Sequence, residues 1–134
     1  MNVRDLLPIL EATAPSEYAV LNDRIGLQVG DPDRKVRRIL VTVDVTPAII
    51  KEAARQSADL IISHHPLIYN PLSSVRPDLY PQSLVYSLLQ AGISVYVMHT
   101  NFDCADGGIN DALAERLGVV DTRIMEPTYT EKRF

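Results

Sequence analysis

The chain has 134 residues and a formal net charge of −4, with 46% hydrophobic and 22% charged residues. This composition is typical of one globular domain, and it argues against a general nucleic-acid binder, which needs excess Lys and Arg to displace counterions. No apolar run is long enough to span a bilayer, and the mixed stretch after Met1 predicts no signal peptide. The single cysteine, Cys104, has no partner for an internal disulfide, which favours a cytoplasmic location.

The first half of the chain predicts a helix followed by two strands and a second helix. The first helix is expected to begin after Asn2, a residue type that caps helix N-termini. A short strand follows over 25–29, and a nearly continuous β-branched run predicts a buried strand over 36–43. Thr46 and Pro47 then supply the cap and the first position of the second helix.

The second half repeats a strand and a helix twice. Strands are predicted over 60–63 and 93–98, and helices over 81–90 and 107–117. The alternation from residue 36 onward predicts an α/β fold, a mostly parallel sheet with helical crossovers, in a single domain over residues 1–134. Four apolar residues of the last helix are expected to face inward: Ile109, Leu113, Ala114 and Leu117.

Side chains with metal-binding chemistry stand directly after the carboxyl ends of three predicted strands. Asp44 follows the first of these strands, His64 and His65 follow the second, and His99 and Asp103 follow the third. The chain has three histidines, and all of them lie in the last two stretches. Ligands of open α/β sheets bind beyond the carboxyl ends of the strands. The sequence therefore predicts one functional site at this edge of the sheet.

The residue types favour a site for two metal ions. His64 and His65 can reach two separate ions where the backbone turns at the strand end, and Asp103 can bind or bridge them. Imidazole and carboxylate ligands suit zinc, iron, manganese or nickel. His99 is open to three roles, as a third ligand, a proton shuttle or an orienting residue. The competing interpretation is that these are loop histidines in ordinary hydrogen bonds and an aspartate that caps a turn.

Four other features are expected to be structural. Asp44 is expected to stabilise the turn before the second helix, in preference to holding a metal-bound water. Cys104 is expected to be a small buried side chain, although it could act as a ligand or a nucleophile. The pair Gly107-Gly108 predicts a tight turn, and less often a phosphate site. The basic run Arg34–Arg38 predicts a solvated edge at the opposite end of the sheet, and less often a phosphate or nucleic-acid patch.

Four motifs occur in a fixed order, and together they resemble the NIF-three-like family, whose members are called GTP cyclohydrolase 1 type 2 homologues. The resemblance extends from Leu6 to Tyr129. It implies that His64, His65 and Asp103 are ligands of two divalent metal ions, with His99 beside the site as the catalytic candidate. The motifs are Gly26-Leu27-Gln28-Val29-Gly30-Asp31-Pro32, Ser63-His64-His65-Pro66-Leu67-Ile68, His99-Thr100-Asn101-Phe102-Asp103 and Gly107-Gly108-Ile109-Asn110-Asp111.

The same resemblance implies a metal-dependent hydrolase that opens the ring of a purine nucleotide such as GTP. The alternative is a non-catalytic metal-binding or interaction protein. Family members form a ring-shaped homo-oligomer, typically a hexamer, and carry a second half with a His and a Glu that complete the metal pair. The chain, which stops at Phe134, is thus expected to correspond to the N-terminal half of that longer architecture.

Overall fold

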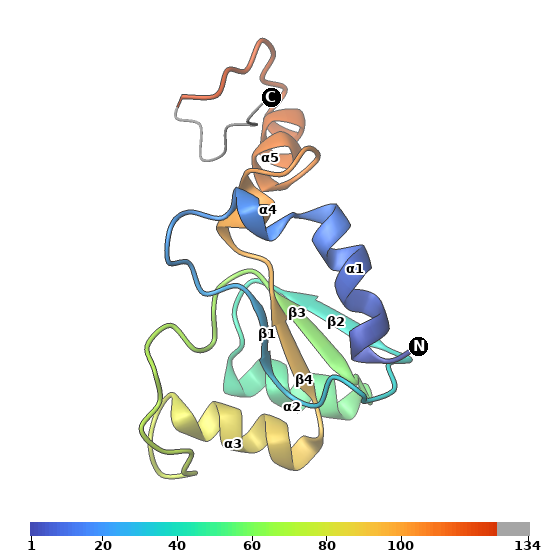
Figure 1. Ribbon diagram of the computed structural model, residues 1–134, viewed down its shortest axis with the longest axis vertical. Coiled ribbons are helices and arrows are strands. Elements are labelled where there is room, and N and C mark those ends of the chain that lie inside the picture. The colour runs from blue at the N-terminus through green and yellow to red at the C-terminus, as the bar shows by residue number, and fades with distance from the viewer. Residues whose placement is uncertain (126–134) are drawn as a thin grey trace.

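The computed structural model describes residues 1–125 and shows an α/β fold built on one four-stranded sheet (Figure 1). The last part of the family resemblance, which ends at Tyr129, lies outside the described residues, as does Phe134. Neighbouring strands β2, β3 and β4 are parallel, whereas β1 is antiparallel to β4. The strands, in their order across the sheet, are β1 (Gly26–Val29), β4 (Ser94–Val97), β3 (Leu60–Ser63) and β2 (Ile39–Thr42).

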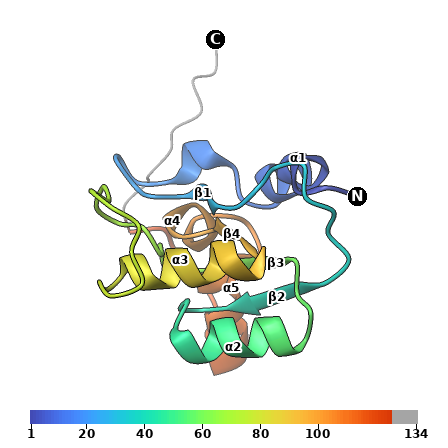
Figure 2. The same ribbon diagram turned by 90° about the horizontal axis from the view of Figure 1, so that it is seen from below.

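Helices cover both faces of the sheet. Helices α2 and α3 are the crossovers between the parallel strands and lie together on one face, while α1 lies on the other (Figure 1, Figure 2). The predicted fold class, a mostly parallel α/β sheet with helical crossovers, is therefore confirmed. Within residues 1–125, no helix is both long and apolar enough to cross a membrane. The helices are α1 (Val3–Thr13), the 3₁₀ helix η1 (Ser16–Tyr18), α2 (Pro47–Arg55), α3 (Gln82–Ala91), α4 (Thr100–Asp103) and α5 (Ile109–Leu117).

The central strands β3 and β4 are buried on both faces, which explains their continuous apolar sequence. Successive side chains of a strand point to opposite faces. Ile61 and Val95 accordingly pack with α2 and α3, together with Leu88, whereas Leu60 and Tyr96 pack with α1. This double burial fixes the register of the two strands, because a slip by one residue would exchange the two sets of side chains.

Local signals set the ends of the helices. The hydroxyl of Thr46 accepts a hydrogen bond of 3.3 Å from the backbone N–H of Ile49, as expected for the N-cap of α2. Helices α3 and α5 both end at a glycine in the left-handed region, with a φ of 64° at Gly92 and 69° at Gly118. The start of α2 and the ends of α3 and α5 were therefore readable from capping residues, whereas α5 begins at Ile109, two residues later than predicted.

The prediction that the first long strand is buried is wrong for one of its faces. Strand β2 is the edge strand, and the side chains of Ile39 and Val41 are 41% and 76% exposed. They point to the face that α1 covers, but α1 packs over β3 and β4 and leaves β2 open. Leu40, on the other face of β2, packs against the core beside α2 and α3.

The predicted inward face of α5 is also only partly covered. Ile109 and Ala114 are half-buried, but Leu113 and Leu117 are 53% and 74% exposed. Helix α5 follows α4 beyond the end of the sheet and makes its main described contacts with α4 (Figure 1). The helical period was thus correct, and the error was to assume that the sheet covers this helix.

The antiparallel pairing of β1 was not predicted, and it positions part of the site. Gly26, the first residue of β1, is paired with Val97, the last residue of β4. The segment that precedes β1 is therefore brought to the carboxyl end of β4. This places Asp23 beside His99, 76 positions away in the sequence.

We predict that Leu88→Ala lowers the free energy of unfolding by about 2–5 kcal/mol, because Leu88 is fully buried and its truncation leaves a cavity. The matched control is Leu89→Ala, in which a neighbouring leucine of the same helix is 53% exposed and the expected loss is below about 1 kcal/mol. Urea denaturation of both variants measures the difference. Equal losses would show that α3 does not bury the face that carries Leu88.

Candidate metal centre

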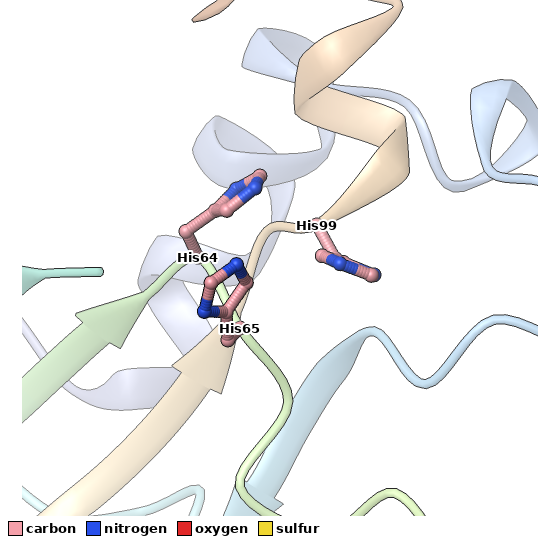
Figure 3. A group of neighbouring side chains, drawn as sticks. All are labelled: His64, His65 and His99. Atoms are coloured by element: carbon pink, nitrogen blue, oxygen red, sulfur yellow. The ribbon is translucent and has the colours of Figure 1, made fainter. Parts of the chain in front are cut away.

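The three histidines converge at the carboxyl end of the sheet. Strands β3 and β4 are adjacent and parallel, with Ser63 opposite Val97, so His64, His65 and His99 follow side by side (Figure 3). One ring nitrogen from each histidine can be chosen so that all three lie within 4.8 Å of one another. The ring centroids are 5.0, 5.1 and 5.9 Å apart. This cluster can hold a metal ion.

Backbone hydrogen bonds continue past the strand ends and hold the histidine backbone. The N–H of His64 donates to the carbonyl of Thr42 at 3.1 Å, and that of His65 donates to the carbonyl of Val43 at 2.9 Å. On the other side, the N–H of Met98 donates to the carbonyl of Ser63 at 3.0 Å. The two histidines are therefore positioned by the sheet and not by a free loop, which gives the precision that a metal site requires.

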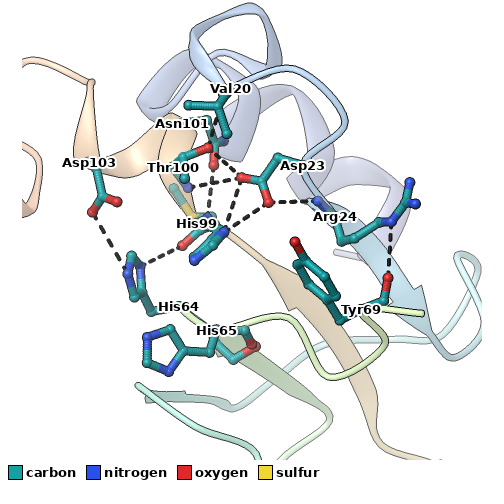
Figure 4. Close-up of polar contacts among 12 residues, drawn as sticks. Val20, Asp23, Arg24, His64, His65, Tyr69, His99, Thr100, Asn101 and Asp103 are labelled. Carbon is teal, nitrogen blue, oxygen red and sulfur yellow. Dashed lines mark hydrogen bonds and ion pairs between the residues drawn. The ribbon is translucent and has the colours of Figure 1, made fainter. Parts of the chain in front are cut away.

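The ring of His64 is oriented by one neighbour and faces another. Its Nδ1 lies 3.0 Å from the backbone carbonyl of Met98, which can only accept, so the neutral ring carries its proton on Nδ1 (Figure 4). Its Nε2 then has a free lone pair and lies 3.7 Å from a carboxylate oxygen of Asp103. A lone pair and a carboxylate that face each other across this gap offer two ligands to a cation between them.

His65 is oriented in the same way by Asp44. Its Nδ1 lies 2.7 Å from Oδ1 of Asp44, which leaves Nε2 for a ligand. The prediction that Asp44 serves the turn before α2 is wrong for its side chain, although its backbone carbonyl accepts a hydrogen bond from Thr42 at 3.1 Å. Both side chains are half-exposed or more, so this contact sets ring orientation and adds little to stability.

The third pair, His99 and Asp23, is more buried. The carboxylate of Asp23 is 3% exposed and accepts from Nδ1 of His99, with distances of 2.9 and 3.1 Å to its two oxygens (Figure 4). Burial raises the pKa of this carboxyl, but hydrogen bonds from the Thr100 hydroxyl, His99 and the backbone N–H groups of Arg24 and Thr100 outweigh it. The pKa of Asp23 therefore lies below its ordinary value, and the carboxylate stays ionised beside His99.

Asn101 fixes the turn that presents His99. It is 1% exposed, its side-chain oxygen accepts from the N–H of His99 at 2.9 Å, and its side-chain nitrogen donates to the carbonyl of Ala14 at 2.8 Å. Asn101 and Asp23 were both missed as functional positions. The available signal was their place in or directly before the motifs, since neither residue type reveals its partner from sequence.

The glutamine of the first motif connects β1 to the loop that follows His65. The side chain of Gln28 donates to the carbonyl of Ile68 at 3.1 Å and accepts from its N–H at 2.8 Å. Arg24 supports the same loop by donating to the carbonyl of Tyr69 at 3.1 Å (Figure 4). These contacts connect the loop after His65 to β1 and to the segment that precedes it.

The Gly-Gly motif holds the segment that carries Asp103, as the prediction of a tight turn requires. A Cβ on Gly108 would lie 1.9 Å from the carbonyl oxygen of Phe102, so only glycine fits there. The side chain of Asn110 donates to the carbonyl of Asp103 at 2.9 Å. Cys104 was expected to be buried, but it is exposed on this segment, and within residues 1–125 it does not belong to the metal-binding cluster of the three histidines.

Comparisons with known proteins agree on one family. The family described as Duf34/NIF3 (NGG1p interacting factor 3) matches residues 1–133. A Bacillus subtilis protein named GTP cyclohydrolase 1 type 2 homolog is 40% identical over 131 residues, which are 98% of this chain and 35% of that protein. A Listeria innocua protein of the same name is 42% identical over 123 residues, covering 92% of this chain and 33% of that protein.

Solved structures show the same similarity. A Bacillus cereus protein related to NIF3 superposes with a TM-score of 0.91 at 39% identity, over 96% of this chain and 36% of that one. Reduced HcgD from Methanocaldococcus jannaschii superposes with a TM-score of 0.77 at 34% identity, over 86% of this chain and 46% of that one. The chain thus spans about a third of the length of the Bacillus and Listeria relatives named above.

We predict that Asp23→Asn lowers the free energy of unfolding at pH 7 by about 1–3 kcal/mol, because buried donors lose a charged acceptor. The folded pKa of Asp23 lies below the unfolded value, so its stabilisation is fully present above about pH 4 and is lost as pH falls through the folded pKa. The deficit of the variant should therefore shrink at pH 3, as measured by urea denaturation. Asp106→Asn, at an exposed position, is the control, and a deficit of Asp23→Asn that is independent of pH would contradict this assignment.

Proposed function

The chain belongs to the Duf34/NIF3 family, as its sequence motifs predict, and we propose that its histidine cluster and Asp103 form part of a site for two divalent metal ions in a hydrolase. Relatives carry the name GTP cyclohydrolase 1 type 2 homolog. We therefore propose a purine nucleotide such as GTP as the substrate class, with ring opening by water as the reaction.

One observation supports metal binding most strongly. In all three histidines Nδ1 lies within 3.1 Å of an oxygen acceptor, and Nε2 is left for a ligand. Such oxygen partners are the usual supports of metal-ligating histidines, since they fix the tautomer and the ring orientation. Three loop histidines in unrelated hydrogen bonds are not expected to share this arrangement at the ends of two neighbouring strands. The imidazole and carboxylate donors suit zinc, iron, manganese or nickel.

We assign the ligand roles to His64, His65 and Asp103, and a proton-transfer role to His99. The three-histidine cluster includes His99 in place of Asp103, so geometry alone is compatible with His99 as a ligand. We favour the proton role because Asp23 holds Nδ1 of His99 and thereby leaves Nε2 to take up or release a proton. Bound divalent ions would supply Lewis-acid polarisation of the substrate.

We further propose, from the resemblance and the length of the relatives, that this α/β domain is the N-terminal half of a longer architecture that assembles into a ring-shaped homo-oligomer, typically a hexamer. A cytoplasmic location is proposed from the single cysteine, which has no partner for an internal disulfide. Native mass spectrometry of the purified protein tests the assembly, and a monomer at all concentrations would contradict it.

We predict that His65→Ala and Asp103→Asn each weaken zinc binding at least about tenfold, since even residues that only support metal ligands contribute about 10–100-fold. Competition with a chromophoric chelator measures the affinity. Asp106→Asn is the matched control for Asp103→Asn, because it removes the same charge three positions away. Unchanged affinity in both ligand variants would remove the metal site from this edge of the sheet.

We predict that His99→Gln keeps the bound metal but lowers GTP turnover by about 10²–10⁴-fold, the usual contribution of a general acid or base. Elemental analysis and a turnover assay on the metal-loaded protein are made on the same sample. Loss of metal from this variant would make His99 a ligand. No metal-dependent turnover by the unmutated, metal-loaded protein would favour the alternative function, a non-catalytic metal-binding or interaction protein.

A further inference from the structure

Two adjoining hollows lie at the end of the sheet opposite the histidines. Their volumes are about 280 and 300 Å³, and Arg34 lines both of them. Lys35 and Arg37 line the first, while Ser94, the first residue of β4, lines the second. Ser94 and His99 are five residues apart, so at about 3.3 Å per residue the hollows lie roughly 16 Å from the metal centre. They are therefore separate from the site described above.

The acidic residues of the first hollow are already engaged by the backbone. Oδ2 of Asp59 accepts from the N–H groups of Arg37 and Arg38, at 2.9 and 3.2 Å. Oδ1 of Asp31 accepts from the N–H of Asp33 at 2.8 Å. These carboxylates stabilise the loop and are not paired with the basic side chains around them.

The basic side chains of the hollows are unpaired. Within the described residues, the side chains of Arg34, Lys35 and Arg37 make no hydrogen bond or ion pair. Nearby basic residues behave differently, since Arg4 pairs with Asp33 at 3.0 Å and Arg38 donates to the carbonyl of Gln56. The first hollow therefore carries three free cationic side chains against the two carboxylates of Asp31 and Asp59, which leaves a small positive excess in a chain whose net charge is −4.

A buried donor at the second hollow also lacks an acceptor. Ser94 is 0% exposed, and its hydroxyl has no hydrogen-bond partner. Buried hydroxyls without partners are uncommon and call for an explanation such as an absent ligand. Only glycine fits at position 30 beside this hydroxyl, because a Cβ there would overlap Oγ of Ser94.

We propose that these hollows bind a phosphate group, either as free phosphate or as part of a nucleotide. Arg34, Lys35 and Arg37 would neutralise its charge, and the hydroxyl of Ser94 would donate to one of its oxygens. The hollows are concave and small, which fits one or two phosphate groups and not a nucleic-acid backbone. The site requires no metal, so it stands independently of the proposed function.

Isothermal titration with inorganic phosphate, at low ionic strength and with excess EDTA, tests the site without contribution from the metal centre. Arg34→Gln and Arg37→Gln are each expected to weaken binding about tenfold, the usual worth of a hydrogen bond to a charged group. Arg38→Gln is the matched control: it removes the same charge from the same run but lies outside the hollows, and it should change affinity by less than about twofold. Ser94→Ala should weaken binding about threefold or more and leave its salt dependence unchanged.

A second titration uses GTP under the same conditions. GTP binding that is tighter than phosphate and is weakened by Arg34→Gln identifies a nucleotide phosphate as the ligand, and binding no tighter than phosphate identifies the free anion. The proposal is overturned if neither compound binds at low salt, or if Arg38→Gln weakens binding as much as Arg34→Gln. Circular dichroism of each variant confirms that the comparison is made on folded protein.

Discussion

The parallel register of β3 and β4 is the constraint on which the candidate site depends. Ser63 is opposite Val97, so β3 and β4 end at the same level of the sheet and the residues that follow them lie side by side. The register is fixed because both strands are buried on two faces, and a slip would move Ile61 and Val95 out of one core and into the other. Packing in the core of the protein therefore determines the separation of imidazoles at its edge.

Strand β1 pairs with β4 and brings a second chain segment to the histidines. Side chains of this segment and of β1 supply supporting hydrogen bonds to the site. Without β1 the carboxylate of Asp23 would not reach His99, and Gln28 would not hold the loop after His65. The three imidazoles then have three different supports: a backbone carbonyl, an exposed carboxylate and a buried carboxylate. Of the two carboxylate supports, the one beside His99 is buried, since Asp23 is 3% exposed and Asp44 is 60% exposed. This difference is the reason why we separate the role of His99 from those of His64 and His65.

The sequence predicted what local chemistry determines and missed what depends on tertiary pairing. Capping residues such as Thr46 and Gly92 indicated where helices begin or end, and β-branched apolar runs indicated β3 and β4. The fold class and the convergence of His64, His65 and His99 could therefore be predicted. The contact between Asp23 and His99 depends on the antiparallel pairing of β1, which no local pattern encodes. The inward face of α5 was assigned from its period, but a period cannot say whether another element is there to cover it.

The most direct measurement of the central claim is an NMR spectrum of the imidazole nitrogens during titration of the protein with zinc. The structure predicts that the resonances of Nε2 of His64 and His65 shift on coordination. The protons on Nδ1 should remain, because the carbonyl of Met98 and the carboxylate of Asp44 accept their hydrogen bonds. Coordination through Nδ1, or nitrogen signals that do not respond to zinc, would show that these oxygen contacts do not prepare the histidines for metal binding.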